Sequence, residues 1–197
     1  MHAIRTALVV AIVLAGQPAA RAESTQAGVI SGSVSASAPR YLADTFVYLK
    51  RVEGAYPART VTIDQKGLSF MPHMVTATVG DQGHFENHDG VYHNVFSKDH
   101  GGYNVGTFGP GQSGNHLFDK EGVFAQLCSI HPEMLGYVFV GQNPFATSVD
   151  KQGRFRIEGV PPGHYQIAVW NPQLLAGEQA VSVAAGKQTA VNFEIHR

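Results

Sequence analysis

No stretch of this chain keeps a helical hydrophobic period for more than two turns, and this feature most limits the folds open to it. Apolar and polar residues instead alternate over short runs, as in Thr45–Leu49 and His164–Trp170. Most of the 22 glycines and 10 prolines fall between such runs, where they are typical of turns. We therefore predict an all-β fold of packed sandwiches, with a long loop over the glycine-rich stretch 98–114.

The N-terminus has the pattern of a secretory signal peptide covering residues 1–22. A short basic start precedes an apolar run, Thr6–Ala15, which is too short to cross a bilayer. Small residues around Ala20 and Ala22 then supply a cleavage site. We expect an exported, periplasmic protein with no stable membrane span after cleavage; an uncleaved anchor is the alternative.

Charge and cysteine content narrow the classes of function further. The formal net charge is −1 and the sequence has no basic stripe, so nucleic acid is not an expected partner. The chain has one cysteine, Cys128, which cannot form an internal disulfide. A free cysteine in an exported protein is either a small buried hydrophobic residue or a reactive or metal-binding thiolate.

The neighbours of Cys128 favour a metal site. His131 and Met134 follow it at intervals of three residues, so one tight loop can direct all three side chains at one ion, and His93 supplies a second imidazole. Two histidines, one thiolate and a weak axial methionine are the donor set of blue-copper sites. Zinc is the competing ion, but structural zinc sites use four Cys or His ligands. Iron–sulfur clusters need more thiolates than the chain has.

These residues resemble a known family, the cupredoxins. The resemblance covers roughly residues 60–141, and the three-residue spacing of the ligands is similar to that of amicyanin and pseudoazurin. It implies one type 1 copper ion bound by His93, Cys128, His131 and Met134, with Asn94 hydrogen-bonded across to the Cys128 loop. Ile130 and Glu133 depart from the usual loop. The motif consists of Phe85-x-Asn87, His93-Asn94, Gly122, Cys128-x-x-His131-x-x-Met134-x-Gly136 and Val138-x-Val140.

Segments on both sides of this region resemble the two halves of a carboxypeptidase-regulatory-like, transthyretin-like sandwich. The second half shows Asp150-x-x-Gly153-x-Phe155 and Val160-Pro161-Pro162-Gly163, and the first shows Ile30-x-Gly32-x-Val34. We therefore expect a sandwich split by an inserted cupredoxin domain. The alternative is an N-terminal extension with a separate C-terminal domain. The expected divisions are 28–57 and 142–197 for the flanking sandwich and 58–141 for the cupredoxin domain.

Three functions fit these observations. The first is a non-enzymatic carrier of single electrons between periplasmic redox partner proteins, and the family resemblance, which extends to accessory proteins of methylamine utilisation, implies a role in methylamine oxidation. The second is copper binding or delivery without redox turnover. The third is a copper oxidase or nitrite reductase, which needs further copper centres.

The remaining histidines are expected to be solvated or structural, with a second weak metal site near His88 or His100 as the alternative.

Overall fold

The structure is a computed structural model that describes residues 26–37, 39–175 and 177–196. Within these residues the chain is nearly all strand, with only two short 3-10 helices, Pro39–Asp44 (η1) and Asp99–Gly101 (η2). The prediction of an all-β fold is therefore confirmed. None of the described helices is long and apolar enough to cross a membrane. The predicted signal peptide lies outside the described residues.

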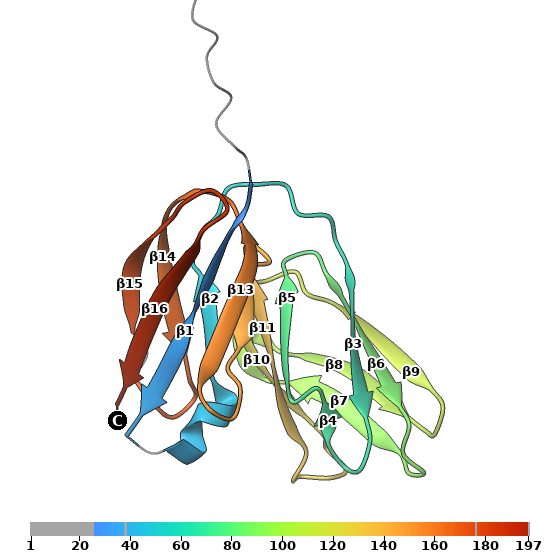
Figure 1. The fold of residues 1–197 in the computed structure, drawn as a ribbon. Coiled ribbons are helices and arrows are strands. Elements are labelled where there is room, and N and C mark those ends of the chain that lie inside the picture. Colours follow the sequence, from blue (N-terminus) through green and yellow to red (C-terminus); the bar gives the residue numbers. More distant parts are fainter. Residues whose placement is uncertain (1–25, 38, 176, 197) are drawn as a thin grey trace, which may run out of the picture.

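Two sandwiches stand side by side (Figure 1). The flanking sandwich packs a sheet of order β13-β1-β16 against a sheet of order β12-β2-β14-β15. Its strands are β1 (Gly28–Ala36), β2 (Phe46–Leu49), β12 (Ala146–Ser148), β13 (Arg154–Val160), β14 (Gly163–Trp170), β15 (Glu178–Val183) and β16 (Gln188–Ile195).

The flanking sandwich is assembled from both ends of the described chain. Strand β1 lies between β13, to which it is antiparallel, and β16, to which it is parallel. Strand β2 lies between β12 and β14. Both N-terminal strands thus pair with strands that follow the central sandwich, as expected for a sandwich split by an insertion. The divisions placed at 57/58 and 141/142 stay predictions.

The central sandwich packs a sheet of order β5-β11-β10-β7-β8 against a sheet of order β4-β3-β6-β9. Alternate residues of its strands point inward, and Ile63 and Phe85 are almost wholly buried between the sheets. The strands are β3 (Thr60–Gln65), β4 (Phe70–Met71), β5 (Met74–Thr78), β6 (Gln82–Asn87), β7 (His93–Ser97), β8 (Tyr103–Phe108), β9 (Ser113–Leu117), β10 (Gly122–Leu127) and β11 (Leu135–Gly141).

The prediction of a long loop over residues 98–114 was wrong. Strand β8 pairs with β7, and β9 pairs with β6. The register between β7 and β8 shifts by one residue at Val95/Phe96, so β8 carries a bulge. The bulge interrupts the two-residue alternation between Val105 and the buried Phe108, which explains why the strand is hard to see in the sequence.

The two sandwiches meet through aromatic side chains. Phe139 of β11 contacts Phe46 and Tyr48 of β2, with ring centroids 5.6 and 4.4 Å apart. Tyr137 contacts Trp170 of β14 at 5.4 Å. Both Phe46 and Phe139 are buried, so these contacts form a small apolar interface in addition to the two hydrophobic cores.

Candidate metal centre

Two neighbouring strands of the central sandwich place the predicted ligands at one end of the sheet. Strands β10 and β7 are antiparallel neighbours, so Cys128, which follows the end of β10, lies near His93, which begins β7. The loop 128–134 connects β10 to β11, whose antiparallel register begins at Leu127 and Leu135. The amide of Met134 donates to the carbonyl of His131 at 3.1 Å, closing a turn within this loop.

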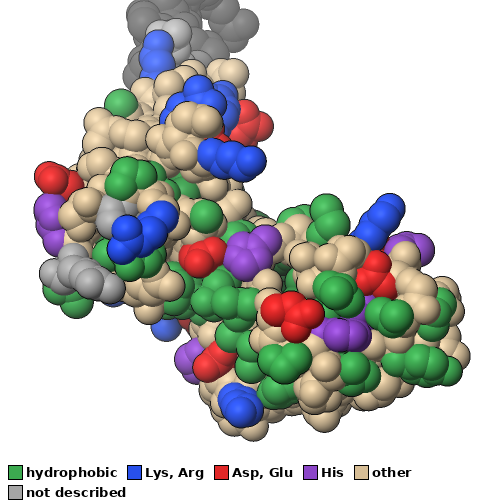
Figure 2. Space-filling view, turned by 90° about the horizontal axis from the view of Figure 1, so that it is seen from below, with side chains coloured by type: hydrophobic (Ala, Val, Ile, Leu, Met, Phe, Trp, Pro, Cys, Tyr) green, Lys and Arg blue, Asp and Glu red, His purple; other side chains and the backbone are tan. Residues whose placement is uncertain are grey.

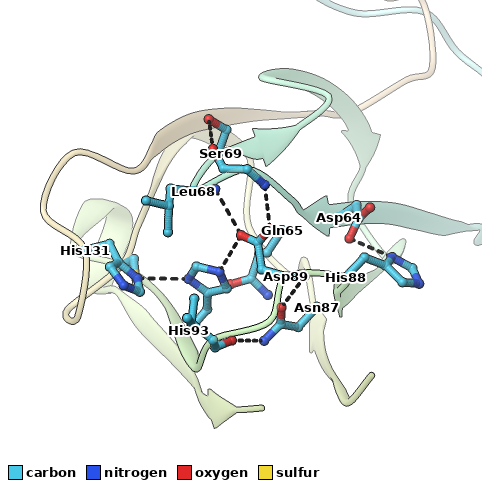
Figure 3. A network of polar contacts seen from close by, with 12 residues as sticks. Asp64, Gln65, Leu68, Ser69, Asn87, His88, Asp89, His93 and His131 are labelled. Atoms are coloured by element: carbon cyan, nitrogen blue, oxygen red, sulfur yellow. Dashed lines mark hydrogen bonds and ion pairs between the residues drawn. The ribbon is translucent and has the colours of Figure 1, made fainter. Parts of the chain in front are cut away.

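Three of the four predicted ligands converge. The Sγ of Cys128 and the ring nitrogens of His93 and His131 all lie within 4.8 Å of one another. The two Nδ1 atoms are 3.0 Å apart, and Nδ1 of His131 is 3.9 Å from Sγ (Figure 3 shows the two rings). His93 and Cys128 are 0 and 4% exposed, whereas His131 is only partly buried. The pocket therefore has a protected interior and one ligand at the surface.

The fourth predicted ligand, Met134, lies at the end of the same loop. Its side chain is 1% exposed and belongs to the hydrophobic cluster that also contains Cys128. The thioether is thus held on the apolar side of the loop, away from solvent. This placement suits a weak ligand whose influence on a metal depends on a fixed position.

Asn94 contacts the Cys128 loop through its backbone. Its amide N–H donates to Sγ of Cys128 at 3.4 Å. Its side-chain Nδ2 donates instead to Oδ1 of Asn104 and to the carbonyl of Gly106, both at 2.9 Å, which ties the start of β7 to β8. An N–H that contacts the sulfur of a metal-binding cysteine is one of the surrounding contacts that tune a bound metal.

Asp89 is a residue of the candidate site that the sequence analysis missed. Its carboxylate accepts a hydrogen bond from Nε2 of His93 at 2.9 Å and from the amides of Gly67 and Leu68 at 2.6 and 3.0 Å (Figure 3). Burial alone would raise the pKa of Asp89, but the two amides and His93 hold that pKa below its ordinary value. An ionised Asp89 favours the tautomer of His93 with its proton on Nε2, so the Nδ1 lone pair faces Nδ1 of His131 and can bind an ion.

The donor spacing fits a small ion. A tetrahedral ion with bonds of about 2.0 Å to nitrogen and about 2.3 Å to sulfur separates its donors by roughly 3.3 to 3.6 Å. The observed separations of 3.0 and 3.9 Å bracket that range. A thiolate with two imidazoles suits copper or zinc and excludes the hard cations Ca²⁺ and Mg²⁺, which take oxygen ligands.

Apolar side chains gather at the same end of the sandwich. Among the described residues, nine large hydrophobic side chains are more than a third exposed, and six of them lie in the segments 68–71, 91–92 and 130–135. Figure 2 shows hydrophobic side chains beside histidine and acidic side chains on this end of the molecule. Clustered exposed apolar side chains mark an interaction surface. The six are Leu68, Met71, Val91, Tyr92, Ile130 and Leu135.

Several other histidines have structural surroundings. The ring of His100 packs on Phe124, and His116 stacks on Tyr103 with centroids 3.6 Å apart. Burial lowers the pKa of His116. Nε2 of His73 lies 2.8 Å from Oδ1 of Asp44, in the flanking sandwich.

Comparisons with known proteins give matches to parts of this chain. A family described as "Polysaccharide lyase family 4, domain II" matches residues 140–191. No curated protein matches the chain. A purple cupredoxin from Nitrosopumilus maritimus is 28% identical, with a TM-score of 0.37, over 41% of this chain and 98% of that one.

Two further solved structures are similar to the chain. The copper-containing nitrite reductase NirK from Thermus scotoductus SA-01 is 26% identical, with a TM-score of 0.41, and the match covers 47% of this chain but only 24% of that one. A mutant of amicyanin in its Cu(I) form is 20% identical, with a TM-score of 0.39, over 41% of this chain and 81% of that one. All three TM-scores are below 0.5.

Proposed function

We propose that this protein binds one copper ion in a type 1 site and carries single electrons between redox partners without being an enzyme. The observation that carries this proposal is the convergence of Cys128 Sγ with the ring nitrogens of His93 and His131, beside the buried Met134. This donor set is the one that blue-copper electron carriers use. A bound copper ion would supply a one-electron couple at a place that protein side chains fix.

The surrounding residues keep the donors in position. Asp89 holds His93 from one side and the amide of Asn94 holds the sulfur from the other. Both contacts come from segments attached to the sheet, so the donor atoms cannot move far when the charge at the site changes. A small rearrangement keeps the barrier to electron transfer low, because little polar reorganisation accompanies the charge change.

His131 and its apolar surroundings provide a route for the electron. Its ring is partly exposed, and the neighbouring Ile130 is 45% exposed. Redox partners form small, transient interfaces, for which an apolar patch around one exposed ligand is well suited. We propose that one periplasmic donor and one acceptor dock here in turn. The resemblance to cupredoxins of methylamine utilisation supports a methylamine-oxidising pathway as the setting.

Visible and EPR spectra of the copper-loaded protein test this proposal. We expect an intense thiolate-to-Cu(II) band that a mild reductant bleaches reversibly. Cys128→Ser should abolish the band. Met134→Gln should retain copper and lower its reduction potential, because an amide oxygen is harder than a thioether and favours Cu(II).

Two results would contradict the proposal. A Cys128→Ser protein with an unchanged spectrum would show that the thiolate is not a ligand. A colourless protein that retains Cu(I) and resists oxidation would instead establish copper binding and delivery without redox turnover.

A further inference from the structure

A second group of metal-binding side chains lies on the outer face of the smaller sheet of the central sandwich. His84, Glu86 and His88 alternate along β6 and just beyond its end, so all three point away from the core. Asp64 of β3 lies directly beside Glu86 in the parallel register of the two strands. Figure 3 shows Asp64 and His88 facing each other at the end of these strands.

The donor atoms of Asp64, Glu86 and His88 all lie within 4.8 Å of one another, close enough to share one ion. Nδ1 of His88 lies 2.9 Å from Oδ1 of Asp64 and 4.0 Å from Oε2 of Glu86. Oε1 of Glu86 lies 3.4 Å from Nε2 of His84. Donors around a tetrahedral ion with bonds of about 2.1 Å are roughly 3.4 Å apart, so these separations need only small side-chain rotations.

The charges around the group favour a cation. Within the described part of the chain, no lysine or arginine forms an ion pair with Asp64 or Glu86. The two carboxylates therefore face imidazoles alone. A divalent ion would neutralise both carboxylates and use the Nδ1 lone pair of His88.

We propose that Asp64, Glu86 and His88 form a second metal site, which binds one divalent transition-metal ion, with His84 beside it at the other carboxylate oxygen of Glu86. One imidazole and two carboxylates suit Zn²⁺ and Cu²⁺, with Cu²⁺ the tighter of the two. The four side chains are between 24 and 56% exposed, so an ion exchanges directly with solvent. The site does not depend on the copper assignment at Cys128.

Calorimetric titration of the full protein with ZnCl₂ tests the site. The unmodified protein should bind one equivalent more than His88→Ala or Glu86→Gln, or bind the second equivalent at least about tenfold more tightly. His164→Ala is the matched control, because His164 is another outward-facing strand histidine, bonded to Ser182 in the flanking sandwich. It should bind as the unmodified protein does. Equal stoichiometry and affinity in all four proteins would overturn the proposal.

The ring ¹⁵N chemical shifts of the histidines locate the ion separately from the Cys128 site. Zn²⁺ should move the ring signals of His84 and His88, and this change should persist in Cys128→Ser. Changes confined to His93 and His131 would overturn the second site while leaving the first intact. Changes at His84 and His88 without any at His93 and His131 would uphold the second site and count against the first.

Discussion

At the scale of single residues, the candidate metal centre depends on Asp89 as much as on the predicted ligands. Carboxylates that accept the distal N–H of a ligating histidine raise its basicity, and their loss costs about 10- to 100-fold in metal affinity. Asp89 has this relation to His93 and also anchors the amides of Gly67 and Leu68. It therefore couples ligand orientation to the folding of a neighbouring loop.

We expect Asp89→Asn to weaken copper binding by about 10- to 100-fold, since the amide oxygen still accepts the His93 N–H but carries no charge. Competition with a chromophoric copper chelator measures this change. Asp150→Asn is the control, because Asp150 likewise accepts backbone amides, those of Gln152 and Arg154, but in the flanking sandwich. Equal affinities in the two variants would show that Asp89 does not act on the metal.

The convergence of Cys128, His131 and His93 could be predicted from the sequence and the contact of Asp89 could not, for a physical reason. Cys128, His131 and Met134 share one short loop, so their spacing alone brings them together. The role of Asp89 requires residues 67 and 68 to fold back over it, and nothing local to Asp89 in the sequence reports that contact. Its position four residues before His93 was the only available signal.

At the scale of elements, the strands with a clear apolar alternation were predicted, and four strands without one were not. The two halves of the flanking sandwich carry their own turn motifs, which made the split arrangement predictable. Strand β8 was missed because its bulge breaks the alternation, and β9 because Leu117 is its only large apolar residue. Strands β4 and β12 were missed because they have only two and three residues. The aromatic interface between the sandwiches was missed for a different reason. Alternation along a strand indicates that Phe139 is buried, but it does not indicate which residues Phe139 packs against.

The close pairing of β1 with β16 depends on a glycine. A Cβ on Gly32 would collide with the carbonyl oxygen of Val191, its partner in the register. We expect Gly32→Ala to lower the free energy of unfolding by about 1–3 kcal/mol, because the strands must separate to admit the methyl group. Denaturant unfolding measures this loss. Gly177→Ala, whose Cβ would meet only an ordinary contact with Phe193, should cost much less.

At the scale of the whole molecule, the two sandwiches are joined by contacts that also position the sheet bearing the metal site. Phe139 is 7% exposed and packs on Phe46 and Tyr48. We expect Phe139→Ala to destabilise the protein by about 3–5 kcal/mol through the cavity it leaves. Thermal unfolding measures this loss. The ligand geometry should survive, so the copper-loaded variant should keep the visible band of the unmodified protein at low temperature.

The ion pair between His73 and Asp44 makes this junction sensitive to pH. The hydrogen bond with Asp44 raises the pKa of His73 above its ordinary value of 6.5, against the opposing effect of burial. A raised folded-state pKa stabilises the protein fully below about pH 6.5, and that contribution is lost as pH rises through the folded pKa. The unfolding midpoint of His73→Gln should therefore lie below that of the unmodified protein at pH 5.5, and the two midpoints should converge by pH 9.

Asp44→Asn should show the same pH dependence, and the double variant should lose no more stability than either single variant, because both changes remove the same interaction. A loss that stays equal at both pH values would mean that packing of the His73 ring on Tyr137, and not its charge, holds the junction.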